Sequence, residues 1–212
     1  MLSFTPNRYN LLENLPNGST VLLPAATHKT RNNDIEYPFR QDSNFYYLTG
    51  LDEPDAVLAL MKDKEGTTKE VLFVLPKDPA KEIWTGLRLG ADKAVTKLGF
   101  DKAYSLEQID AKLPKLLVGQ STIYAPMSDT KFFERILGWR QKADSLAYDE
   151  AIKNLESGRM KELPSTYVDI LPILARMRLI KTRKEIELIK QACETSAIAH
   201  TKLMEKCEPG ML

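Results

Sequence analysis

Short apolar runs separated by turn-forming residues recur along the chain, in the lengths that strands require. Four of these runs are predicted to be strands, at residues 19–23, 56–61, 70–75 and 121–125. Gly66 lies between the second and third runs and permits a tight turn, so this pair predicts an antiparallel hairpin.

Helices are predicted between these strands. The first begins at Thr5, its expected cap, followed by Pro6 in the first turn. Its inward side chains are predicted to be Tyr9, Leu12 and Leu15. Further helices are predicted over 91–98 and over 168–176. Another begins at a capping box at Ser105, and Pro114 interrupts or ends it. A fourth is predicted over 129–141, with four buried side chains: Phe132, Phe133, Ile136 and Leu137. Helices alternating with strands, one hairpin among them, predict a mixed α/β sheet flanked by helices.

The C-terminal part of the sequence is dominated by one long amphipathic helical pattern. Thr182 and Glu185 form a capping box that opens it, and the helix is predicted to run to about Cys207. Its apolar face consists of residues spaced by three and four: Ile186, Ile189, Cys193, Ala197, His200 and Met204. A lone amphipathic helix needs a partner surface. We therefore expect residues 1–175 to form one domain, and 176–212 to be a linker and the truncated start of a second.

Composition and charge restrict the possible partners. The 212 residues include 30 Lys and Arg against 29 Asp and Glu, which argues against nucleic acid as a partner. No apolar run approaches the ~20 residues of a membrane-spanning helix, and the first residues do not form a signal peptide. The two cysteines, Cys193 and Cys207, lie in the same predicted helix at a separation of about 21 Å, too far for a disulfide. Reduced thiols predict a cytoplasmic protein.

Local motifs reveal no catalytic apparatus. The sequence lacks CxxC, HxH, HExxH and GxSxG motifs and a phosphate-binding glycine loop, and its two histidines, His28 and His200, are far apart along the chain. After Asp169 the sequence contains no aspartate. We therefore expect no catalytic residue and no metal site within this chain.

Two segments combine polar and aromatic residues in a loop-like context. The first, residues 31–42, contains Asp34, Tyr37 and Arg40, and is either an ordinary surface turn or the lining of a site in which Arg40 pairs with a carboxylate. The second, residues 82–88, contains Trp84, which is either a core aromatic or an interface anchor.

These segments carry a family resemblance. The stretch RNNDIEYPFRQDSNFYYLTGLDEPDAVLAL followed by EIWTGLRLG resembles the N-terminal domain of Xaa-Pro aminopeptidase (aminopeptidase P), of the creatinase and prolidase superfamily. The later run from Ala175 to Met211 resembles that family's entry into its catalytic domain.

The resemblance implies an N-terminal α/β domain of the creatinase type, followed by a catalytic pita-bread domain. In the family, the second domain binds two divalent metal ions, usually manganese, and hydrolyses the bond before a proline at the second position of a peptide. The family's metal ligands lie beyond the end of this chain. The resemblance thus implies that the full-length parent is an Xaa-Pro metalloaminopeptidase and that this chain alone is inactive.

The family's N-terminal domain also makes subunit contacts in a homo-oligomer, a dimer or tetramer, and restricts access to the active site. By resemblance, Trp84 reaches toward a neighbouring subunit's active site, and Asp34 lies at the rim of that pocket. Tyr37 and Arg40 lie in the same matching segment. Two alternatives stay open: a stand-alone, non-catalytic oligomerisation or peptide-binding module, and a prolidase or creatinase relative.

Overall fold

The computed structural model describes residues 3–153 and 161–211, and the chain divides into two compact units. The first unit runs from Ser3 to Leu174, and the second begins at Ala175.

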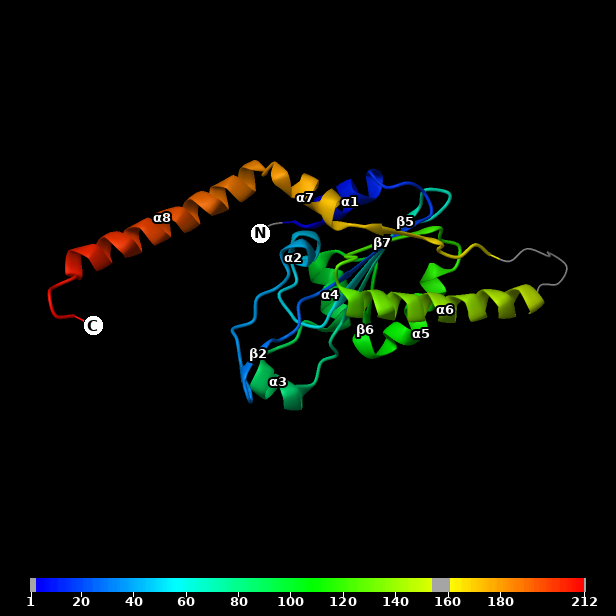
Figure 1. Ribbon diagram of the computed structural model, residues 1–212, viewed down its shortest axis with the longest axis horizontal. Helices are drawn as coiled ribbons and strands as arrows, with labels where there is room; N and C mark the ends of the chain where they lie inside the picture. The colour runs from blue at the N-terminus through cyan, green and yellow to red at the C-terminus, as the bar shows by residue number, and fades with distance from the viewer. Residues whose placement is uncertain (1–2, 154–160, 212) are drawn as a thin grey trace. The chain divides into compact units, whose positions relative to one another are not determined.

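The first unit is built on a six-stranded sheet (Figure 1). Its strands, in spatial order, are β6 (Lys102–Ser105), β5 (Thr68–Val74), β4 (Val57–Lys62), β1 (Ser19–Pro24), β7 (Thr122–Ala125) and β8 (Thr166–Asp169). Strand β4 pairs antiparallel with both β5 and β1, whereas the β5–β6, β1–β7 and β7–β8 pairs are parallel. The predicted mixed sheet is confirmed, as is the hairpin, whose turn places Gly66 at a φ of 88°.

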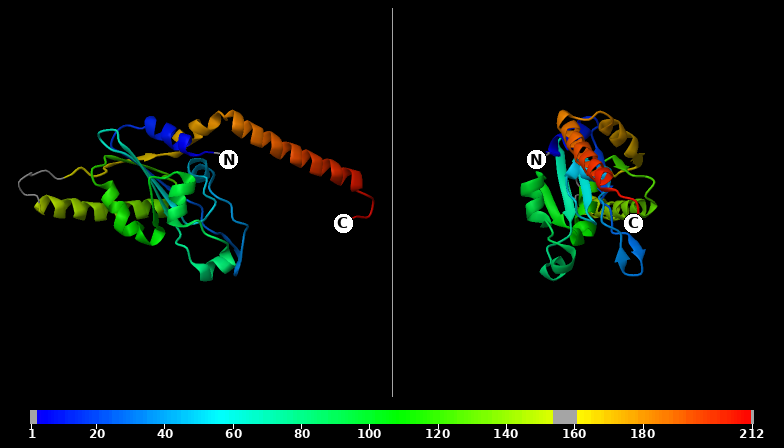
Figure 2. Two further views of the ribbon diagram at one scale, coloured as in Figure 1. Left: turned by 180° about the vertical axis from the view of Figure 1, so that it is seen from behind. Right: turned by 90° about the vertical axis from the view of Figure 1, so that its left-hand side faces the viewer.

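Helices cover both faces of this sheet (Figures 1 and 2). Helices α5 (Ile109–Leu117) and α6 (Thr130–Lys153) pack on one face, against alternate residues of the central strands such as Leu22 and Ala59. The intervening strand residues point to the other face, where three helices lie: α1 (Thr5–Glu13), α2 (Ser43–Thr49) and α4 (Gly90–Leu98). Each face thus has its own buried apolar layer.

Helix α1 begins where predicted, but two details of the prediction are wrong. Its N-cap is Phe4, and Thr5 lies inside the helix, where its Oγ1 accepts a hydrogen bond from Arg8 Nη2 (3.2 Å). Tyr9 points outward and is 62% exposed, because the buried face of the helix is formed by Arg8, Leu11 and Leu12. An arginine in the interior is unexpected from sequence, since this residue type is almost never fully buried unless paired.

Two predictions on the α5–α6 face also needed correction. Helix α5 continues through Pro114 and ends at Leu117, so the proline neither interrupts nor ends it at that point. The proline removes one N–H donor from the helix, and less than a full turn follows it. In α6, Phe132 and Ile136 are buried as predicted and Phe133 partly so, but Leu137 is 41% exposed and Trp139 is buried instead. A 100° turn per residue places positions 132, 136 and 139 on one face and 137 off it.

Residues 166–169 form strand β8, although the sequence predicted a helix that begins at Val168. Thr166 and Tyr167 pair with Thr122 and Ile123 of β7, and the strand thereby uses hydrogen-bonding groups that β7 would otherwise leave open. The helix that follows, α7 (Leu171–Leu179), begins three residues later than predicted.

The second unit contains the end of α7 and helix α8 (Arg183–Lys206). The predicted capping box is confirmed: Thr182 Oγ1 accepts from the N–H of Glu185 (3.3 Å), and Glu185 Oε2 accepts from the N–H of Thr182 (2.7 Å). None of the residues of α8 is buried, although it has the predicted apolar residues.

Candidate functional site

The candidate site lies at the edge of the sheet where parallel strands β1, β7 and β8 end. After β1 the chain leads to α2 on one face of the sheet, and after β7 it leads to α6 on the other. Where connections diverge to opposite faces, a crevice opens beyond the carboxyl ends of the strands, and ligands of α/β sheets bind in such crevices.

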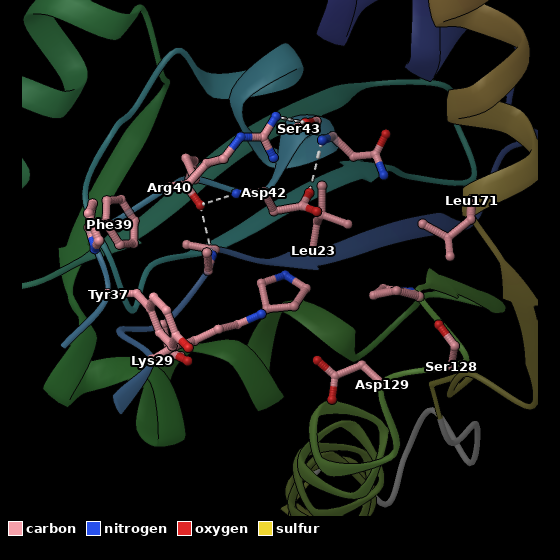
Figure 3. Close-up of a pocket in the computed structure, with 18 residues that line it drawn as sticks. Leu23, Lys29, Tyr37, Phe39, Arg40, Asp42, Ser43, Ser128, Asp129 and Leu171 are labelled. Atoms are coloured by element: carbon pink, nitrogen blue, oxygen red, sulfur yellow. Dashed lines mark hydrogen bonds between the residues drawn. The ribbon is translucent and has the colours of Figure 1, made fainter. Parts of the chain in front are cut away.

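A pocket of about 580 Å³ occupies this position (Figure 3). Its lining comes from four segments of the chain: the end of β1 and the loop after it (residues 23–29), the segment 37–44, the turn after β7 (Pro126, Ser128 and Asp129) and the first residue of α7 (Leu171). Tyr37 and Phe39 supply aromatic rings, and Lys29 and Arg40 supply positive charge. Polar and charged side chains thus share the lining with apolar and aromatic ones, so a ligand here would meet both kinds of surface.

Gln41 fixes the floor of this pocket. The side chain is 6% exposed, and its Oε1 accepts hydrogen bonds from the N–H groups of Ala26 (2.7 Å) and Asp42 (2.9 Å). Its Nε2 donates to the carbonyl oxygens of Leu51 (3.2 Å) and Glu53 (2.7 Å). One amide thereby joins the loop after β1, the start of α2 and the loop that leads into β4.

The two carboxylates of the pocket serve as helix caps. Asp42 Oδ1 accepts from the N–H groups of Asn44 (2.9 Å) and Phe45 (2.8 Å), and Asp129 Oδ1 accepts from the N–H of Phe132 (3.0 Å). Arg40 makes a longer contact, from Nη2 to Ser43 Oγ (3.4 Å). The carboxylates are thus held by backbone donors, and the cations that line the pocket, Arg40 and Lys29, are the groups with which a ligand's carboxylate would pair.

The structure places the four candidate residues in two kinds of position. Tyr37 and Arg40 line the pocket together. Asp34 is exposed in the turn of a separate hairpin, formed by β2 (Thr30–Asn32) and β3 (Ile35–Glu36) in a segment that the sequence analysis expected to be a loop.

Trp84 lies on a short helix that the sequence analysis missed, α3 (Pro79–Thr85). Its side chain is 88% exposed, and Ile83 and Leu87 beside it are exposed to a similar extent. Helix α3 and the β2–β3 hairpin lie at the same end of the first unit (Figures 1 and 2). An exposed apolar cluster of this kind is typical of an interaction surface.

Sequence reasoning missed several lining residues, notably Lys29, Phe39 and Asp129. Phe39 belongs to the segment that was singled out, and its ring contacts that of His28 (5.2 Å between centroids). Asp129 follows β7 and precedes a helix, which is a signal for capping but does not indicate a pocket.

Glu53, whose main-chain oxygen accepts from Gln41, is a titratable group next to the pocket lining with a shifted pKa. Burial raises the pKa of its carboxyl above the ordinary 4.5, while a hydrogen bond from the N–H of Leu89 and the charge of Arg88 oppose the rise. Since the folded chain binds this proton more tightly than the unfolded chain, the contribution of Glu53 to stability is full below about pH 4.5 and declines as the pH rises through the raised pKa.

Replacing Glu53 with glutamine is expected to remove this decline. The free energy of unfolding of the variant should therefore gain on that of the unchanged chain as the pH rises above about 4.5. Urea unfolding of both proteins from about pH 4 to about pH 7 measures the difference, with Glu65→Gln, an exposed position, as the matched control. Parallel curves for the Glu53 variant and the unchanged chain would contradict the assignment.

The described residues offer no obvious metal site. Nowhere within 3–153 or 161–211 are three His, Cys, Asp or Glu side chains grouped so that they could hold a metal ion. In the same ranges, no helix has the length and apolar character needed to cross a bilayer.

Comparison with known proteins identifies the class of this α/β unit. The pattern of the family described as "Aminopeptidase P, N-terminal domain" matches residues 4–124, so the chain belongs to that family. It is 39% identical over 210 residues to the Xaa-Pro aminopeptidase of Escherichia coli (strain K12), a match that covers 98% of this chain and 45% of that protein.

Solved structures agree with this assignment. The chain is similar to Escherichia coli aminopeptidase P with the inhibitor Pro-Leu, with a TM-score of 0.85, 38% identity and coverage of 99% of this chain and 45% of that one. The zinc-substituted form of the same enzyme in complex with product gives the same TM-score and identity. The chain thus spans just under half the length of the Escherichia coli enzyme. The predicted family and fold class are confirmed.

Proposed function

We propose that this chain is the non-catalytic N-terminal part of an Xaa-Pro aminopeptidase, a protein that releases the residue preceding a proline at position two. The observation that carries the proposal is the similarity to aminopeptidase P over nearly the whole chain, in a match that covers 45% of the relative's length. In this proposal, residues 1–175 form the N-terminal domain and 176–212 lead into the catalytic domain. Two divalent ions, with manganese expected, bind outside this chain.

The chain alone should not hydrolyse an Xaa-Pro peptide when Mn²⁺ is added, whereas the full-length protein should. Release of the first residue from a short Xaa-Pro peptide measures both. Turnover by the purified chain above that of a buffer blank would overturn the proposal and would favour a complete site within these residues.

We also propose that the domain contributes contacts to a cytoplasmic homo-oligomer, a dimer or tetramer, and restricts entry to the active site. The exposed cluster of Ile83, Trp84 and Leu87 supports a contact surface, since large apolar side chains and tryptophan above all are enriched at interfaces. Cys193 in α8 and Cys207 at its C-terminal cap are both exposed and unpaired, in keeping with a reducing compartment.

Replacing Trp84 with alanine in the full-length protein should impair substrate handling far more than folding. We expect kcat/KM for Xaa-Pro peptides to fall about tenfold, as for the loss of an interface anchor. The free energy of unfolding should change by less than about 0.5 kcal/mol, because the side chain is exposed.

Kinetics on a short and a longer Xaa-Pro peptide measure the effect, with Tyr148→Ala as a control at another exposed aromatic residue. Unchanged kinetics on both peptides would contradict the proposed role of Trp84.

A further inference from the structure

The segment that carries Trp84 has little support of its own. None of the seven residues of α3 is buried. Gly86 ends the helix at a φ of 84°, and no atom from elsewhere in the fold lies within 4 Å of the position that a Cβ would occupy. The position of Trp84 relative to the rest of the first unit therefore depends on contacts at the two ends of this segment.

Arg88 closes the base of the segment. Its Nη1 donates to the carbonyl oxygen of Pro76 (3.1 Å), which lies before α3, so one hydrogen bond joins the outgoing and returning chain. The chain is close-packed at this base: a Cβ on Gly90 would lie 3.0 Å from Lys77 Cγ.

Glu53 attaches this base to the rest of the unit. Its Oε1 accepts from the N–H of Leu89 (2.6 Å), next to Arg88. Its main-chain oxygen accepts from Nε2 of Gln41 (2.7 Å), the residue that forms the floor of the pocket. Glu53 thus joins the pocket segment to the segment that carries Trp84.

We propose that Arg88 and Glu53 are positioning residues, which hold α3 so that Trp84 is presented in a fixed place. Arg88 closes the base of the segment, and Glu53 fixes that base to the pocket floor. The structural part of this inference concerns the chain alone. Its consequence for catalysis rests on the proposed function of Trp84.

The structural part can be tested by ¹⁹F NMR on the chain labelled with 5-fluorotryptophan. The chain has two tryptophans, of which Trp84 is exposed and Trp139 is buried, so Trp139 reports folding in the same spectrum. In Arg88→Ala and in Glu53→Ala we expect the transverse relaxation rate of the Trp84 signal to fall by about a third. The order parameter falls by about this fraction when an ordered backbone becomes flexible. The Trp139 signal should stay unchanged.

Conservative and matched variants separate positioning from general destabilisation. Arg88→Lys keeps a donor for the carbonyl of Pro76 and Glu53→Gln keeps an acceptor for the N–H of Leu89, so both should retain the relaxation rate of the unchanged chain. Arg140→Ala also removes an arginine that donates to a proline carbonyl (Pro164, 3.3 Å), but far from α3 in the sequence, and should leave Trp84 unaffected.

An unchanged Trp84 signal in both alanine variants would overturn the inference. If Glu53→Ala unfolds the chain, the Trp139 signal will report it, and Arg88→Ala then decides alone.

The catalytic consequence is tested in the full-length protein with Arg88→Ala, Trp84→Ala and the double variant. If Arg88 acts through Trp84, Arg88→Ala lowers kcat/KM about tenfold, and the double variant is no slower than Trp84→Ala. Two results would overturn the catalytic consequence while the proposed function stands. One is that the losses in kcat/KM of the two single variants multiply in the double variant. The other is that Arg88→Ala has unchanged kinetics although Trp84→Ala is slow. A Trp84→Ala enzyme with unchanged kinetics would instead contradict the proposed role of Trp84, and the NMR result alone then decides whether the base holds the segment.

Discussion

Replacing Arg8 with alanine is expected to lower the free energy of unfolding by about 3–5 kcal/mol, the loss typical of breaking a buried ion pair. The side chain is completely buried, and its Nε lies 2.6 Å from Glu70 Oε2. Its other nitrogens donate to the carbonyl oxygens of Leu48, Leu98 and Gly99, at 2.9 to 3.1 Å. Alanine would leave the Glu70 carboxylate and the ends of two helices, α2 and α4, without these partners.

The loss caused by Arg8→Ala should also depend on pH. Burial already raises the pKa of Glu70, and the charge of Arg8 opposes that rise. Without Arg8 the pKa should rise further, so the destabilisation should be smaller in acid, where Glu70 is protonated, and larger near neutrality.

Urea unfolding followed by the fluorescence of the buried Trp139 measures this loss. Lys161→Ala removes an exposed ion pair with Glu150 and should change stability by less than about 1 kcal/mol. A double variant, Arg8→Met with Glu70→Leu, should recover part of the loss, because it removes both charges. A loss for Arg8→Ala no larger than that for Lys161→Ala would show that the buried pair does not stabilise the fold.

Replacing Gln41 with leucine is expected to cost about 3 kcal/mol or more. Leucine can neither accept from the N–H groups of Ala26 and Asp42 nor donate to the oxygens of Leu51 and Glu53, and each buried polar group left without a partner costs about 1–3 kcal/mol. Because these groups belong to three segments around the pocket, we expect the pocket to loosen before the sheet does.

Urea unfolding gives the global loss for Gln41→Leu, and amide hydrogen exchange at Ala26 and Asp42 gives the local one. Gln141→Leu, at an exposed position on α6, is the matched control and should change stability by no more than about 0.5 kcal/mol. Exchange at Ala26 and Asp42 that stays as slow in Gln41→Leu as in the unchanged chain would contradict the role given to this amide.

Elements with a local signal were predictable from the sequence. Strand β1 is a continuous buried run, the β4–β5 hairpin has a glycine turn, and α8 has a capping box. Strand β8 was not predictable, because four residues become a strand only when the edge of β7 lies beside them. The burial of Arg8 likewise depends on Glu70, sixty-two positions away in the chain.

The candidate site divides in the same way. Tyr37 and Arg40 fall in one short segment whose polar and aromatic composition already indicated a site, and the structure does place both in the pocket. Asp129 and Leu171 complete the lining from distant parts of the chain, and only the order of the strands brings them there. Helix α3 was missed because it has only seven residues and none of them is buried, so its sequence shows no apolar periodicity.

The two outermost strands of the sheet, β6 and β8, are each only four residues long in the described part of the chain. Short borders of this kind offer few free backbone groups for another polypeptide to extend the sheet, and so they protect against uncontrolled aggregation. Association of copies through exposed side chains, such as those of Ile83 and Leu87, would therefore be favoured over extension of the sheet, and substitutions at such positions would leave the main-chain architecture unaltered.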